Sequence, residues 1–133
     1  MELDKPPRDI TVSEGDREKY SWLSTKFNLE VKQIFLLAVK VGFFYGLRDK
    51  VKNHRSIAQF STFSDDDIKD MITIAYAELE SDSAIFDGKK VVGICEEYAT
   101  GGISKLYKQF AGANKEDVKI IEDMVDELAN EVK

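Results

Sequence analysis

The chain has 133 residues, 43% of them hydrophobic, with a formal net charge of −6 and a single cysteine, Cys95. This length suits one domain, and a chain of this size can bury roughly two thirds of its unfolded surface. One cysteine excludes an internal disulfide, and the N-terminus lacks the basic-then-apolar order of a secretion signal, so we expect a cytoplasmic protein.

Charge is distributed unevenly along the chain. Residues 1–60 hold 11 Lys and Arg against 8 Asp and Glu, a net charge of +3, whereas residues 61–133 hold 8 against 17, a net charge of −9. An anion-binding surface is therefore expected in the first half. Alternatively, the opposite charges attract each other within or between chains.

The N-terminal segment predicts an extended start. Residues 1–7 are expected to form a loose leader, because Pro6 and Pro7 oppose helix formation there. Residues 8–13, RDITVS, alternate apolar and polar side chains and predict a short strand, the only good strand in the sequence. Such a strand is expected either to pair with a second copy across a dimer axis or to lie as an extended edge against helices.

Two helices are predicted next, over residues 16–26 and 28–47, with Asn28 as the N-cap of the second. The second helix is apolar almost all round, with only a thin polar stripe through Gln33 and Lys40. A helix of this kind is buried, so we expect the other helices to pack around it. Its internal polar residues leave no apolar run long enough to span a membrane.

The densest basic run follows this helix. The structural interpretation is a solvated connection whose cations lie favourably near the helix C-terminus. The functional interpretation is a phosphate-contacting loop, because clustered Lys and Arg bind nucleic acid independently of its sequence. The candidate nucleic-acid-binding residues are Arg48, Lys50, Lys52, His54 and Arg55.

Metal and cofactor chemistry is not expected. His54 is the only histidine and Cys95 the only cysteine, so no zinc ligand set can be assembled from these residue types. Four aspartates at residues 65–70 lack the glycine and the bidentate glutamate of a calcium loop. They instead indicate the start of a helix over residues 64–80, with Ser64 and Asp67 at capping-box spacing.

Two further helices complete the predicted fold. Over residues 89–111, the apolar positions keep helical phase across Gly101 and Gly102, which favours one bent helix with another backbone close by. Residues 114–133 form the cleanest amphipathic helix, laid along the bundle or at a dimer seam. The predicted fold is mainly α: a single-domain bundle of about five helices, spanning residues 1–133, with one short N-terminal strand.

A family resemblance emerges from four segments: RDITV, QIFLLAVKVGF, IKDMITIAYAE and EEYATGGISKL. Over about residues 8–110, the chain resembles the small proteins associated with DNA phosphorothioation (Dnd) gene clusters of bacteria and archaea. That family commonly has Asn where this chain has Thr100. The resemblance implies a role in DNA modification and its linked restriction defence, with other proteins of that system as partners. Its specific part comprises Glu96, Glu97, Tyr98, Ala99, Gly101, Gly102 and Ile103.

This EEYATGG signature also has a structural interpretation. Tyr98 would bury its ring and direct its hydroxyl to a partner, while the two glutamates would face solvent or meet Lys105 and Lys108. Adjacent helical carboxylates point about 100° apart and do not readily share one substrate, so acid–base catalysis is disfavoured.

Three functional hypotheses follow. The first is a non-enzymatic accessory component of a DNA phosphorothioation and restriction defence system, which binds duplex DNA or a partner protein. The second is a protein–protein adaptor with no nucleic-acid contact, favoured by the net charge of −6. The third is a dimeric ribbon-helix-helix-like regulator, although Asp9 on the exposed strand face is a poor neighbour for phosphate. The sequence contains no P-loop, dinucleotide fingerprint or nucleophile elbow, which disfavours an enzyme.

Overall fold

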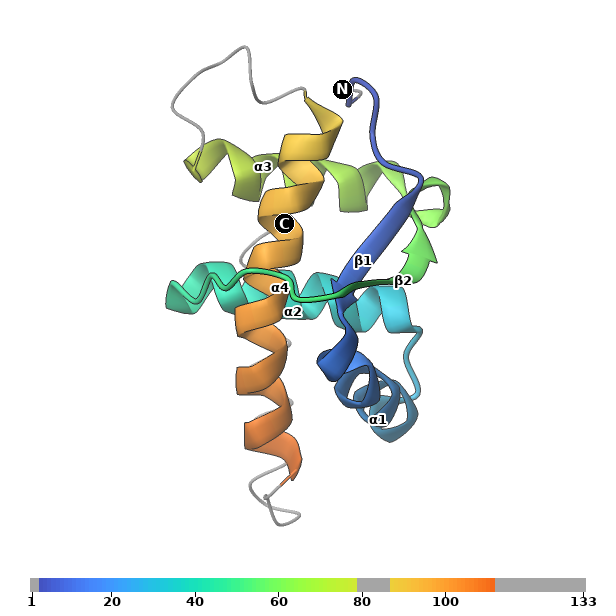
Figure 1. Ribbon diagram of the computed structural model, residues 1–133, viewed down its shortest axis with the longest axis vertical. Helices are drawn as coiled ribbons and strands as arrows, with labels where there is room; N and C mark the ends of the chain where they lie inside the picture. The colour runs from blue at the N-terminus through green and yellow to red at the C-terminus, as the bar shows by residue number, and fades with distance from the viewer. Residues whose placement is uncertain (1–2, 79–86, 112–133) are drawn as a thin grey trace.

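The computed structural model describes residues 3–78 and 87–111 (Figure 1). This part of the chain is mainly α-helical, as the sequence predicts, and it also contains a small antiparallel sheet. The helix predicted at residues 114–133 lies outside the described residues. The elements are β1 (Asp9–Ser13), η1 (Glu14–Asp16), α1 (Arg17–Phe27), α2 (Val31–Tyr45), β2 (His54–Gln59), η2 (Phe60–Thr62), α3 (Asp65–Glu78) and α4 (Gly88–Ala111).

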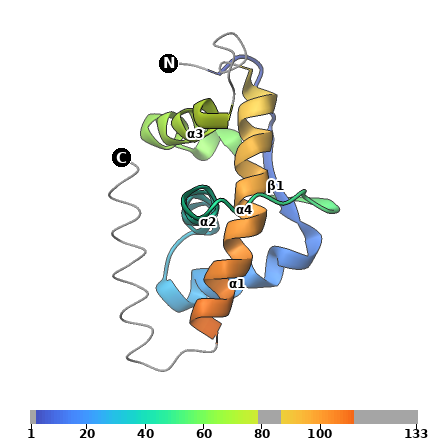
Figure 2. The same ribbon diagram turned by 90° about the vertical axis from the view of Figure 1, so that its left-hand side faces the viewer.

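The core lies where α2 crosses α4. In Figure 2, α2 is seen end-on, with α3 above it, α1 below it and α4 alongside. Each of these two helices contacts both α1 and α3, so α2 shares its expected central position with α4. The core side chains of α2 and α4 include Phe35, Ala38, Val39, Val91, Cys95, Ala99 and Ile103, all no more than 1% exposed.

Three glycines allow this crossing. A Cβ placed on Gly102 would overlap the carbonyl oxygen of Ala38, and a Cβ on Gly42 would overlap that of Tyr98. A Cβ on Gly101 would also meet a carbonyl oxygen, that of Leu47 just after α2, although less closely, at 2.5 Å. The helix α4 continues through Gly101 and Gly102 without a break, so the predicted single helix and the predicted close backbone approach are both confirmed.

The strand β1 pairs antiparallel with β2, in a register that sets Ser13 opposite His54 and Ile10 opposite Ala58. Neither β2 nor pairing within the chain was predicted from the sequence. The segment HRSIAQ has no apolar alternation, and it is a strand because β1 supplies a backbone to pair with. The ribbon-helix-helix hypothesis, which needs β1 to pair across a dimer, is therefore wrong on this point.

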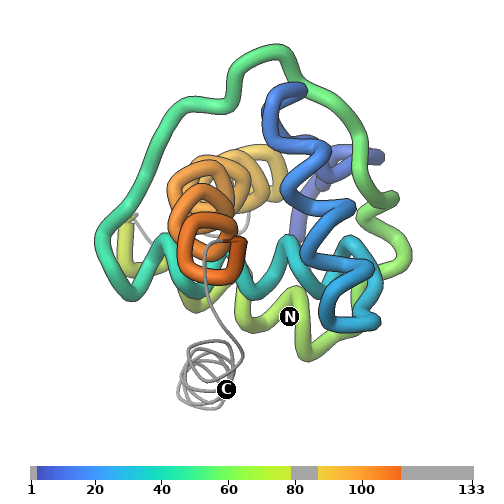
Figure 3. The backbone as a smooth tube through the Cα atoms, turned by 90° about the horizontal axis from the view of Figure 1, so that it is seen from below, coloured from blue at the N-terminus to red at the C-terminus, as the bar shows by residue number. Residues whose placement is uncertain are grey.

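The segment of residues 46–53 runs from α2 to β2 across the outer side of α4. Figure 3 shows it passing around α4, which is enclosed between this segment and α2. The amide of Asp49 donates to the carbonyl oxygen of Glu97, 3.1 Å away, and holds the segment on the helix. The predicted basic loop is thus a short crossing segment, followed by a strand that contains His54 and Arg55.

The predicted cap of α2 is wrong, whereas the predicted cap of α3 is confirmed. Asn28 has a φ of 54° and ends α1 as its C-cap, whereas Glu30 caps α2 in a reciprocal capping box with Gln33. Asparagine favours both roles, because its side chain tolerates the left-handed conformation as well as the N-cap position. At α3, Ser64 and Asp67 form the predicted capping box, with both hydrogen bonds 3.1 Å long.

Burial of α2 also departs from expectation at two places. Lys40, predicted on a polar stripe, is only 6% exposed, and its ammonium lies 3.2 Å from the carboxylate of Asp70 on α3. Phe44, predicted to be buried, is 53% exposed, because it lies on the last turn of α2 before Gly46 ends the helix at the surface. Within the described residues, no helix is both long and apolar enough to cross a membrane.

The segment predicted as a loose leader makes a defined contact. The carbonyl oxygen of Asp4 accepts a 2.7 Å hydrogen bond from the amide of Gly88, at the start of α4. Pro6 lies against the same glycine, where a Cβ would meet its backbone. The first residues of the described chain therefore pack against the N-terminal end of α4.

Candidate functional site

Arg48, the first residue of the predicted basic run, is held by two acidic side chains. Its Nε donates to Oε1 of Glu97 over 2.6 Å, and its Nη1 donates to Oε2 of Glu78 over 3.0 Å. The guanidinium also lies 5.8 Å from the centre of the Tyr98 ring. The hydrogen bond to Glu97 raises the pKa of Arg48 further above its already high value. Arg48 therefore joins α3 and α4 within the chain.

Arg55 and His54 belong to β2 and also have partners. Arg55 pairs with the carboxylate of Glu14 at 3.1 Å, an exposed contact. Nδ1 of His54 lies 2.7 Å from Oγ1 of Thr11. The single Thr11 hydroxyl proton is donated to Glu96, so Nδ1 of His54 must be the donor to Thr11.

Lys50 and Lys52 differ from their basic neighbours. Both are exposed, and neither forms an ion pair with any residue that the structure describes. They line a polar groove of about 570 Å³, here called the lysine groove. Its lining residues are Ser13, Gly15, Asp16, Lys19, Asp49, Lys50, Lys52, Asn53, Thr100 and Ser104.

The backbone around η1 builds the walls of the lysine groove. The amide of Glu14 donates to the carbonyl oxygens of Lys52 and Asn53, 3.2 and 3.0 Å away, and the Lys52 amide donates to Oγ of Ser13. Asn53 turns the chain with a φ of 56°, a conformation that asparagine tolerates. Thr100 and Ser104 lie one turn apart on α4, so they share one face of the helix.

The lysine groove carries a small positive excess. Its three lysines face two aspartates, and one of these, Asp16, pairs with Lys19 at 2.9 Å. Asp16 is only 8% exposed, so this pair lies partly inside the protein. Lys50 and Lys52 supply the remaining positive charge, opposed by Asp49.

The first glutamate of the signature anchors β1. Oε2 of Glu96 accepts hydrogen bonds from the amide and the hydroxyl of Thr11, at 2.6 and 2.8 Å. Glu96 is 8% exposed, and this burial raises the pKa of its carboxyl group, although the hydrogen bonds from Thr11 oppose the shift. The expectation that both glutamates face solvent or meet Lys105 and Lys108 is therefore wrong, because Glu96 contacts β1 and Glu97 contacts Arg48.

Tyr98 and the residues after it also contact their own chain. The Tyr98 hydroxyl donates to Glu78, and burial together with this hydrogen bond raises the pKa of Tyr98 to about 12. Its ring packs edge-on against Phe43, with the ring centres 5.7 Å apart. Thr100 donates to the carbonyl oxygen of Glu96, one turn earlier in α4. Each polar side chain of the signature thus has a hydrogen-bond partner elsewhere in the chain.

Sequence reasoning missed the part of the lysine groove that lies outside the basic run. Lys19 and Ser104 come from two different helices, and only the fold brings them to Lys50 and Lys52. The positive charge of the first half was the one signal that pointed to Lys19. Among the described residues, no group of three or more His, Cys, Asp or Glu side chains is placed to hold a metal ion.

Comparison with known proteins gives one match. The model of a protein family, described as DNA sulphur modification system-associated protein 4, matches residues 24–133. No curated protein and no solved structure matches the chain. The matched segment includes the 46–53 segment, β2 and the whole of α4, but it begins after β1 and η1.

Proposed function

The chain belongs to the family of DNA sulphur modification system-associated protein 4, and from this premise we propose that it is a non-enzymatic accessory component that contacts duplex DNA through the lysine groove. Family membership supports association with a DNA sulphur modification system. The DNA contact is supported by one observation above all: Lys50 and Lys52 are exposed, have no ion pair among the described residues, and line one groove.

The chemistry of the lysine groove suits a phosphodiester backbone. Ammonium groups contact phosphate oxygens as point charges, and hydroxyl groups such as that of Ser104 donate hydrogen bonds to the same oxygens. Such contacts give affinity without sequence preference. The groove combines residues from β1, η1, α1, α4 and the 46–53 segment, so a bound strand would touch several elements of the fold at once.

A non-enzymatic role is supported by the reactive side chains, which are buried or engaged in hydrogen bonds within the chain. The thiol of Cys95 is fully buried, and this burial raises its pKa, which keeps it a poor nucleophile. Glu96 is engaged with Thr11, and the Thr11 hydroxyl is engaged with His54. These groups stabilise the packing of β1 against α4, and a substrate would have to displace them.

The test is a titration of labelled duplex DNA at several salt concentrations, with the parent protein and with Lys50→Gln/Lys52→Gln. Each lost phosphate contact should flatten the slope of log affinity against log salt by about 0.9, so the double variant should lose about 1.8. The control is Lys89→Gln/Lys90→Gln, which makes the same charge change at exposed positions in the first turn of α4. It should keep the parent slope.

Arg48 and Arg55 are left intact in this test, because their replacement would leave Glu78, Glu97 and Glu14 without their cations. The proposal fails if the double variant binds as the parent does, or if both double variants lose the same affinity. Absence of parent binding at low salt would favour the second candidate, a protein-only adaptor. The net charge of −6 and the exposed Phe44 ring support that candidate.

A further inference from the structure

An aromatic pair lies one helical turn beyond the lysine groove. Lys19 of α1 lines this groove, and Trp22 follows it by three residues. Ser104 of α4 also lines the groove, and Tyr107 follows it by three residues. Residues three apart in a helix are neighbours on one face. The two rings meet edge-on, with their centres 5.5 Å apart. The aromatic pair therefore continues the wall that α1 and α4 give to the lysine groove.

The charges beside this pair are positive. The ammonium of Lys26 lies 5.8 Å from the centre of the indole ring and forms no ion pair with any described residue. Residues 19–27 and 98–111, which form the facing parts of α1 and α4, include four lysines and no aspartate or glutamate. One of the four, Lys19, is already paired. A DNA strand that leaves the lysine groove along these helices therefore meets cations and no carboxylate from either segment.

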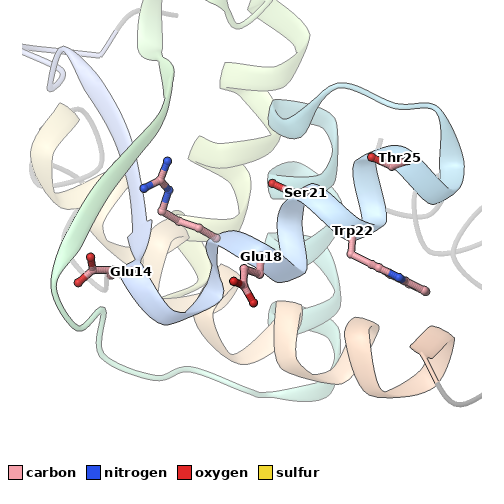
Figure 4. A pocket seen from close by; sticks show the side chains of 6 residues that line it. Glu14, Glu18, Ser21, Trp22 and Thr25 are labelled. Atoms are coloured by element: carbon pink, nitrogen blue, oxygen red, sulfur yellow. The ribbon is translucent and has the colours of Figure 1, made fainter.

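Trp22 also lines a second groove, of about 650 Å³, here called the α1 groove. Its lining residues are Glu14, Arg17, Glu18, Ser21, Trp22 and Thr25 (Figure 4). Figure 4 shows the Trp22 side chain pointing outward from α1, apart from the other labelled side chains. The charge of Arg17 offsets that of Glu18, and Glu14 is paired with Arg55. The groove therefore favours neither an anion nor a cation, and a neutral, planar group with polar edges suits it better.

We propose that the pair of Trp22 and Tyr107 is a stacking platform for an unpaired base of a DNA strand whose phosphates lie in the lysine groove. This inference rests on the proposed function. The base lies in the α1 groove against Trp22, and Lys26 contacts a phosphate beside it. A base inside a duplex is stacked on both faces and cannot reach the indole, so the platform selects DNA with unpaired nucleotides. Because every base has a π-face, the platform has no strong sequence preference.

The test compares oligo(dT) with an abasic oligomer that has the same number of phosphates and no bases. The parent should bind oligo(dT) about five- to hundredfold more tightly, which is the effect expected of one stacked base. Trp22 is the only tryptophan, and oligo(dT) should quench its emission more than the abasic oligomer does. Trp22→Leu should bring the ratio of the two affinities close to one. Trp22→Phe keeps a ring and should keep most of the ratio.

The matched control is Phe44→Leu, which removes an exposed ring at the end of α2 and should leave the ratio unchanged. Lys50→Gln/Lys52→Gln should weaken the binding of both oligomers and flatten both salt dependences, again without changing the ratio. The ratio therefore reports on the base contact, whereas the salt dependence reports on the phosphate contacts. Urea denaturation checks that each Trp22 variant folds. If Trp22→Leu does not fold, the parent ratio and the quenching of Trp22 decide the question.

The outcomes separate this inference from the proposed function. Equal affinity of the parent for the two oligomers, or equal quenching by both, overturns the stacking platform and leaves the lysine groove standing. A folded Trp22→Leu variant that keeps the parent ratio overturns the platform as well. If the parent binds neither the oligomers nor duplex DNA at low salt, both proposals fail together.

Discussion

Gly102 of α4 lies so close to the carbonyl oxygen of Ala38 in α2 that a single added carbon would overlap it. This contact, with the one between Gly42 and Tyr98, sets how closely the two central helices approach. Protein interiors are packed too densely for such an overlap to relax without moving the backbone. The crossing therefore depends on positions where side chains are absent.

The first prediction follows from this crossing. Gly102→Ala should lower the free energy of unfolding by about 2 kcal/mol or more, because overpacking of a core typically costs about 1–3 kcal/mol and here the obstacle is backbone. Gly93 is the matched control, because it lies in the same helix and an added Cβ there would meet nothing within 4 Å. Gly93→Ala should raise stability by up to about 1 kcal/mol, the difference in helix propensity. Urea denaturation measures both changes, and equal effects of the two substitutions would contradict the packing argument.

The second prediction concerns the pH dependence that Glu96 confers. Burial raises the pKa of Glu96 in the folded protein above its ordinary value of 4.5, so folding favours the protonated form. The stabilising contribution of this group is therefore fully present below pH 4.5 and is lost as the pH rises through the folded-state pKa. Glu96→Gln removes the titration and keeps an oxygen that can accept from Thr11.

The measurement for Glu96 is the free energy of unfolding of both proteins over a pH series. The stability of the parent relative to Glu96→Gln should fall as the pH rises from 4.5, and should then level off. Most other titrating groups contribute equally to both proteins, so this difference isolates Glu96. A difference that grows with pH would mean that the hydrogen bonds from Thr11 outweigh the effect of burial.

The third prediction concerns the ion pair between Lys40 and Asp70, whose side chains are only 8% and 16% exposed. Lys40→Met should cost about 3 kcal/mol, because it leaves the largely buried Asp70 carboxylate without a counter-charge. The double variant Lys40→Met/Asp70→Leu should recover most of this loss. For comparison, Arg55→Met breaks the exposed ion pair with Glu14 and should cost less than about 1 kcal/mol. A double variant no more stable than Lys40→Met would show that the charge itself is not the cause.

The fourth prediction uses Cys95 as a reporter of unfolding. Its thiol is fully buried, donates weakly to the carbonyl oxygen of Met71, and has a pKa raised by burial. A thiol reagent should therefore react slowly with the native protein and rapidly in denaturant. Because Cys95 is the only cysteine, one rate describes the reaction. Fast labelling of the native protein would show that α3 separates readily from α4.

The features predicted correctly from the sequence are those with a local signal. The capping box of Ser64 and Asp67 depends on residues three apart, and the continuity of α4 through Gly101 and Gly102 follows from apolar periodicity. The close backbone approach at Gly102 was also indicated by its residue type. These inferences needed no knowledge of which segments meet in space.

The features that were missed depend on segments distant in the sequence. The strand β2 carries no pattern of its own, since its residues are mostly polar and its extended form follows from pairing with β1. Asn28 is compatible with two different helix-end roles, and only the geometry of the following turn separates them. The lysine groove could not be predicted as a unit, because Lys19, Lys50 and Ser104 meet only after α1 and α4 have packed. The basic run was found, but not the intramolecular partners of its arginines.

The pairing of β1 with β2 also has a consequence for the order in which the chain can fold. Thr11 and His54, which contact each other, are 43 residues apart, and both α1 and α2 lie between them. Closing so long a loop before its helices form would cost chain entropy, and the few contacts formed at that stage would not offset this cost. We therefore expect the sheet to assemble after α1 has folded back on α2. Native hydrogen exchange should then find the amides of β1 opening before those of the α2–α4 crossing.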